Sequence, residues 1–310
     1  MKLVVNEWIK LWSKKSTWVM LILMLLLVIV PAGVMKYYDE SSSENWQLTS
    51  QQVIQDFEKI IEEDDLDEST GSYYYERIMT EKYRLEHNIA PNGTTMDKFT
   101  RNMLEVASMV ITIFIVTVAA GIVSSEYSTG TIKMLLTRPV ARWKILLSKL
   151  VTTIIFGLTL YLAAIILSAI LGAIFWGTAM STPLEVIEGQ VVQIDVWSSY
   201  FEMFFLSFGS FFMSIFFAFL IGTIFRSSSL AIGLTLFISF MSNMFVLLLS
   251  RYEFIKYVWI THVNLNQYGT GYTPMIPGTT LTLGLTVNFV YAIIFLVITF
   301  IVFNKRDVTA

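Results

Sequence analysis

The stretch SSEYSTGTIKMLLTRPVARWKILLSKL, residues 124–150, decides the fold because it is a basic segment between two long apolar ones. It contains one acid, Glu126, against five bases: Lys133, Arg138, Arg142, Lys144 and Lys149. Short loops with an excess of lysine and arginine stay on the cytoplasmic side of a membrane. We therefore expect this stretch, the central segment, to join two membrane-spanning helices in the cytoplasm.

A short helix is predicted inside the central segment. Gly130 breaks the preceding helix, and Thr129 or Thr131 can cap a new one. Pro139 then ends it. The apolar face, at helical spacing, consists of Ile132, Leu135 and Leu136. This pattern is typical of a helix that docks onto a cytoplasmic partner, and equally of a helix that lies on lipid headgroups.

The composition indicates an integral membrane protein. Of the 310 residues, 55% are hydrophobic and 15% are charged, whereas soluble domains are about 45 to 50% hydrophobic. The chain has no cysteine, which excludes disulfides and thiolate metal sites.

We predict an all-α integral membrane protein with six transmembrane helices, an N-terminal interfacial helix and an extracytoplasmic helical insert. About 20 apolar residues cross the hydrocarbon core, and six segments satisfy this: 16–35, 103–125, 149–176, 201–225, 230–250 and 281–303. After the second span we expect a cytoplasmic coupling loop at 126–148 and an outer loop at 177–200. A cytoplasmic turn at 226–229, an outer or re-entrant segment at 251–280 and a cytoplasmic tail at 304–310 complete the chain.

Two segments flank the first span. Residues 1–15 repeat apolar side chains at helical spacing, with lysines on the other faces, which predicts an amphipathic helix in the membrane interface. Residues 36–102 contain more than half of the chain's acids and two amphipathic helical patterns, which predict a hairpin outside the membrane.

The distribution of basic residues sets the expected orientation. The N-terminal segment, the central segment and the C-terminal tail are basic, whereas the short outer loops contain only Arg251 and Lys256. The insert is long, and long loops cross the membrane largely regardless of charge. We expect a multi-pass protein of the cell membrane with both termini in the cytoplasm.

The sequence lacks signatures of catalysis. No G-x-x-x-x-G-K-[ST], H-E-x-x-H or G-x-S-x-G motif occurs, and His87 and His262 are the only imidazoles. We predict no catalytic residue, no metal site, no nucleic-acid partner and no cofactor held by this chain.

Some polar and aromatic residues within the spans are candidates for a substrate path, and an apolar, aromatic lining favours an amphiphile over an ion. The candidates are Thr112, Phe208, Phe212, Ser239 and Asn243. Helix packing is the alternative role for the polar members.

The motif E-x-x-x-G-T-x-x-x-L-L followed by R-P-V-x-R-W-x-I-L-x-S-K resembles the segment after the second transmembrane helix of ABC-2 type transporter permeases. The matching residues are Glu126, Gly130, Thr131, Leu135, Leu136, Pro139, Arg142, Trp143 and Lys149. Weaker similarity occurs at residues 262–268 and 303–308, so the resemblance covers the chain from about residue 106 to the C-terminus.

The resemblance implies the permease subunit of an ATP-driven ABC exporter. It implies two cytoplasmic ATPase subunits, which bind ATP and magnesium, and a second permease, identical or related. The coupling residues would be Glu126, Gly130, Thr131, Ile132, Leu135, Leu136, Arg138 and Arg142. The substrate would be a peptide antibiotic or a lipid-like molecule, which connects the chain with multidrug or antimicrobial peptide resistance. The alternative is a membrane sensor or assembly subunit that binds an extracellular ligand without transporting it.

The orientation can be tested with cysteines, because the chain has none of its own. We expect Ser72→Cys to react with an impermeant thiol reagent on intact cells, and Ser128→Cys to react only after permeabilisation. Equal labelling of both variants would exclude the six-span topology.

Overall fold

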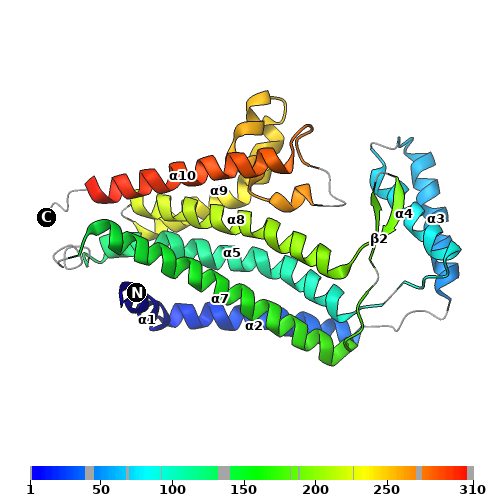
Figure 1. Ribbon diagram of the computed structural model, residues 1–310, viewed down its shortest axis with the longest axis horizontal. Helices are drawn as coiled ribbons and strands as arrows, with labels where there is room; N and C mark the ends of the chain where they lie inside the picture. The colour runs from blue at the N-terminus through cyan, green and yellow to red at the C-terminus, as the bar shows by residue number, and fades with distance from the viewer. Residues whose placement is uncertain are drawn as a thin grey trace. The chain divides into compact units, whose positions relative to one another are not determined.

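The structure is a computed structural model that describes residues 2–38, 45–67, 70–91, 93–131, 140–181, 183–187, 189–225, 227–269 and 274–305 (Figure 1). Within these residues, six helices are long and apolar enough to cross a membrane. They are α2 (Lys15–Tyr37), α5 (Met96–Ser128), α7 (Arg142–Trp176), α8 (Val196–Ile224), α9 (Ser228–Leu249) and α10 (Leu281–Lys305). The chain is a multi-pass membrane protein, and its predicted all-α fold class is confirmed.

The helices are longer than the apolar stretches that reveal them. α5 begins at Met96 and α7 at Arg142, whereas the predicted spans begin at residues 103 and 149. Hydropathy detects only the part of a helix that lies in hydrocarbon, while the helical hydrogen bonding continues through the polar residues on either side. The connection between α5 and α7 is correspondingly shorter than the predicted 126–148.

The chain divides into two compact units. The first comprises Met1–Val28, Met103–Leu167 and Met203–Ala310. Its largest core joins α1 (Lys2–Trp12) with α2, α5, α7, α8 and α10 through buried side chains that include Leu11, Met24, Ile115, Leu146, Phe156, Phe219 and Phe303. A neighbouring core, with Ala120, Ala231, Trp259 and Phe295, adds α9 and the segment after it. The helices α1, α2, α5, α7, α8 and α10 thus share one apolar core.

The segment after α9 forms three short 3₁₀ helices in its described part: η1 (Glu253–Tyr257), η2 (Trp259–His262) and η3 (Leu265–Tyr268). His262 is fully buried, with its Nε2 2.7 Å from the Lys256 carbonyl oxygen and its Nδ1 2.6 Å from the Tyr268 hydroxyl. Burial lowers the pKa of His262, against the opposing hydrogen bond to Lys256. The predicted outer or re-entrant segment, residues 251–280, therefore contains folded 3₁₀ helices, and His262 is a structural hydrogen bonder there.

The second unit comprises Ile29–Asn102 and Ser168–Glu202. Its helices α3 (Trp46–Glu63) and α4 (Ser72–Glu86) form the predicted hairpin, in which Ser50 Oγ donates to Glu81 Oε2 at 2.8 Å. A short antiparallel pair, β1 (Leu184–Ile187) and β2 (Gln190–Gln193), lies where the sequence predicted only a loop. Gly189, with a φ of +75°, makes the turn between these strands.

One contact between spanning helices is close enough to test. A Cβ atom added at Gly222 of α8 would lie 2.3 Å from the carbonyl oxygen of Ala120 in α5, so only glycine allows this approach. We expect Gly222→Ala to lower the stability of the purified protein by about 1 to 3 kcal/mol, because the backbones must separate.

The matched control is Gly233→Ala on α9, where an added Cβ meets nothing within 4 Å. Thermal unfolding in detergent should show a lower midpoint for Gly222→Ala and an unchanged or higher midpoint for Gly233→Ala. An equal effect of both changes would argue against the close packing of α5 and α8.

Candidate functional site

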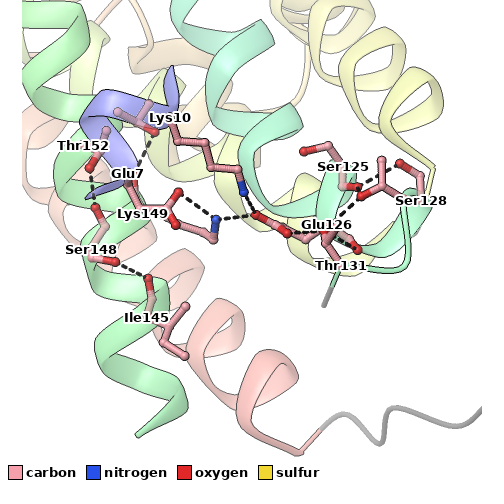
Figure 2. Close-up of polar contacts among 12 residues, drawn as sticks. Glu7, Lys10, Ser125, Glu126, Ser128, Thr131, Ile145, Ser148, Lys149 and Thr152 are labelled. Carbon is pink, nitrogen blue, oxygen red and sulfur yellow. Dashed lines mark hydrogen bonds and ion pairs between the residues drawn. The ribbon is translucent and has the colours of Figure 1, made fainter. Parts of the chain in front are cut away.

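A buried lysine, Lys149, lies near the C-terminal end of the central segment, within α7. Lys149, in the second turn of α7, is only 1% exposed. Its Nζ donates to Glu7 Oε2 at 2.9 Å and to Glu126 Oε1 at 3.0 Å (Figure 2). The two carboxylates come from α1 and from the last turn of α5, so one ammonium group joins three helices.

Glu126 accepts hydrogen bonds from three different side chains. Its Oε1 accepts hydrogen bonds from Lys10 and Lys149, and its Oε2 accepts one from the Thr131 hydroxyl (Figure 2). A carboxylate at a helix C-terminus is opposed by the helix dipole, and burial adds a desolvation cost. The two ammonium groups and the hydroxyl offset these costs. We call Glu7, Lys10, Glu126 and Lys149 the charge cluster.

The N-terminal helix is held by more than charge. Glu7 and Leu11, one turn apart on α1, are both buried, and Trp8 and Trp12 pack against the main core. The Thr152 hydroxyl of α7 lies 3.4 Å from the carbonyl oxygen of Val4. The structure therefore packs α1 against α5 and α7, whereas the sequence indicated only a helix in the membrane interface.

The predicted coupling residues are in part close to the charge cluster. Glu126 belongs to it and Thr131 donates to it, while Gly130, with a φ of +71°, lets the chain turn directly after α5. Arg142, at the start of α7, donates from Nη1 to the Asn304 carbonyl oxygen at 3.1 Å. The remaining four lie outside the described residues: Ile132, Leu135, Leu136 and Arg138.

The predicted path residues are spread over three helices. Thr112 of α5 donates to the Ser108 carbonyl oxygen at 2.7 Å, which is a contact within its own helix. The rings of Phe208 and Phe212 on α8 are 5.9 Å apart and border the main core. Ser239 and Asn243 are on α9, and in the described part of the chain no hydrogen bond or ring contact joins them to the other three. The contacts of Thr112 and of the two phenylalanines are those of packed helices.

Sequence reasoning missed that Glu7 and Lys10 belong to the site. The helical pattern of residues 1–15 places Lys10 away from the apolar side chains, and it makes no prediction for Glu7. One signal was available: Glu7 is the only acid before residue 39, in a segment otherwise rich in lysine. A lone acid of this kind indicates a specific cationic partner, although the sequence does not say which lysine.

The arrangement offers a mechanical connection between helices. The described residues contain no group of three or more His, Cys, Asp or Glu side chains that could hold a metal ion. The site can, however, hold the end of α5 and the start of α7 together, with α1 attached to both.

Comparison with known proteins supplies a family. Residues 72–309 match the family described as "Protein of unknown function (DUF2705)". The "Uncharacterized protein YhcI" of Bacillus subtilis (strain 168) is 33% identical over 315 residues, which cover 99% of each chain. The "Uncharacterized membrane protein YdbK" of the same organism is 29% identical over 195 residues, 62% of this chain and 76% of the relative. The printed name of the second relative describes a membrane protein, in agreement with the six spanning helices.

The charge cluster predicts a large effect of removing its central lysine. We expect Lys149→Met to lower stability by about 3 to 5 kcal/mol, because the buried Glu7 then loses its ion pair and Glu126 keeps only that with Lys10. Lys144→Met, on the same helix but exposed, should change stability by about 0.5 kcal/mol or less.

Adding Glu7→Gln to Lys149→Met removes one buried negative charge together with the positive one. We expect the double variant to recover part of the stability that Lys149→Met loses. Unfolding of the purified protein in detergent, followed by tryptophan fluorescence, measures all four forms. If Lys149→Met and Lys144→Met were equally stable, Lys149 would not be buried between the carboxylates.

Proposed function

The chain belongs to the DUF2705 family, and we propose that it is the membrane-spanning permease subunit of an ATP-driven ABC-2 exporter. Both termini and the central segment are in the cytoplasm in this proposal. Two ATPase subunits that hold ATP and magnesium dock on the central segment, and a second permease, identical or related, completes the complex. The substrate is an amphiphilic or hydrophobic molecule.

The observation that carries the proposal is the position of the charge cluster. Glu126 and Lys149 lie at the two ends of the central segment and are joined by an ion pair of 3.0 Å. A force applied to the segment is therefore passed to α5 and α7 together, and through Glu7 and Lys10 also to α1. Such a connection is what an ATPase needs in order to move several spans at once.

Two further observations support this function. The central segment carries the residues that resemble the ABC-2 permeases, and five bases that favour a cytoplasmic location. The chain also lacks a P-loop, so an ATP-driven role requires a separate ATPase.

The test begins with the neighbouring reading frame, where we expect a soluble P-loop ATPase, and then measures docking of that ATPase on this chain. On the predicted short helix, Leu135 shares an apolar face with Ile132 and Leu136, so Leu135→Asp would put an unpaired carboxylate into an apolar contact. Such a burial costs several kcal/mol, and we expect docking to fall about a hundredfold or more. Lys133→Ala, which removes only a charge at the rim, should reduce docking about fivefold or less.

Co-purification of the two proteins and the ATPase rate in lipid nanodiscs are the measurements, with membrane insertion checked by the cysteine labelling above. Full docking and full substrate-stimulated hydrolysis of Leu135→Asp would refute the role of the central segment. Stimulated hydrolysis without uptake of substrate into inverted vesicles would favour the sensor subunit over the exporter.

A further inference from the structure

A small pocket opens beside the charge cluster. Glu7, Lys10, Glu126 and Lys149 line it together with Leu11, Lys14, Ile122 and Ser125. Three of the lining residues are lysines and two are glutamates, so the pocket carries one surplus positive charge when all five are ionised. Lys10 and Lys14 are exposed, which makes the pocket accessible from the surface.

The surplus charge belongs to Lys14. In the described part of the chain Lys14 makes no ion pair, in contrast to Lys10 and Lys149. Although its side chain reaches solvent, desolvation by the surrounding protein lowers the pKa of Lys14, and the charges of Lys10 and Lys149 lower it further. Glu126 and Glu7 oppose these effects without reversing them. An anion bound beside Lys14 would favour its protonated form.

The ammonium groups of Lys10 and Lys14 have hydrogen-bond donors that a ligand in the pocket could use. An ammonium group has three donors, and Lys10 directs one of them at Glu126, so that two remain. Lys14 contributes its own donors, while the buried Lys149 is already engaged by two carboxylates. A ligand with several acceptor oxygens and a negative charge matches two neighbouring ammonium groups, and phosphate is such a ligand.

The surroundings are those of a membrane interface. Trp12 and Trp18 flank Lys14 in sequence, with their rings 5.2 Å apart and the Trp18 indole nitrogen donating to the Trp12 carbonyl oxygen at 3.0 Å. Tryptophan is enriched at headgroup depth. Basic pockets between spanning helices bind the headgroups of anionic lipids.

We propose that the pocket lined by Lys10, Lys14, Lys149 and the two glutamates binds a phosphate group, donated to by Lys10 and Lys14. The two sources of such a group are the headgroup of an anionic phospholipid and inorganic phosphate in the cytoplasm. This site is independent of the proposed permease role, because it requires neither an ATPase nor a transported substrate.

The experiment uses the full chain in nanodiscs of phosphatidylcholine that contain a minor fraction of phosphatidylglycerol. The protein is extracted, washed in about 1 M salt, where the Debye length is only about 3 Å, and the retained lipid is counted by native mass spectrometry. We expect the unmodified protein to retain phosphatidylglycerol about tenfold over its share of the bilayer, and Lys14→Gln to lose this enrichment. Lys14→Arg keeps the charge and should retain it.

Lys15→Gln is the matched control, because it removes the same charge one residue further along and Lys15 does not line the pocket. Its enrichment should equal that of the unmodified protein. Equal losses in Lys14→Gln and Lys15→Gln would overturn the proposal, and so would a protein that shows neither this enrichment nor the phosphate-dependent shift described next.

A second arm distinguishes the two sources. Inorganic phosphate is added to the protein in nanodiscs of phosphatidylcholine alone, and the unfolding temperature is measured for the unmodified protein and Lys14→Gln. No shift, together with enrichment of phosphatidylglycerol, assigns the site to the lipid. A shift that needs Lys14, without lipid enrichment, supports the phosphate site and overturns the lipid as its source.

Discussion

The ammonium group of Lys149 is the constraint on which the arrangement of the first unit depends. A charged group removed from water costs several kcal/mol unless it is paired and hydrogen-bonded in good geometry. Lys149 finds its acceptors on two other helices, Glu7 on α1 and Glu126 on α5. The lysine is satisfied only when all three helices are in register, so a single side chain makes their relative positions interdependent. Apolar packing alone does not specify a register as sharply, because hydrophobic contacts tolerate small shifts.

This interdependence gives the N-terminal helix a role beyond membrane attachment. α1 supplies Glu7 and Lys10 to the same carboxylate and ammonium groups that hold the base of the central segment. A protein docked on the central segment and an anion bound in the pocket, as proposed above, would both act on the charge cluster. Protein docking and the lipid environment are therefore expected to act on one electrostatic balance, with Glu126 as the residue common to both.

The parts of the structure that the sequence predicts well are those set by local rules. A span needs about 20 apolar residues whatever its neighbours are, and the α3–α4 hairpin follows from apolar side chains at helical spacing. The pairing of Glu7 with Lys149 bridges 142 positions of the chain, and no local pattern reveals a partner so far away. The β1–β2 pair was missed because four-residue strands give too short a pattern. The role of Ile132, Leu135 and Leu136 stays a prediction, because they lie outside the described residues.

The unequal lengths of the spanning helices have a consequence for the bilayer itself. At about 1.5 Å per residue, the 33 residues of α5 extend about 50 Å, whereas the 22 residues of α9 extend about 33 Å. The hydrocarbon core is about 30 Å thick, so α5 crosses it with several turns to spare and α9 barely does. In a thicker bilayer, α9 is the first spanning helix whose ends are drawn into hydrocarbon, and local thinning of the lipid is one way to accommodate it. Acyl-chain length thus acts on this protein through the shortest of its described spanning helices.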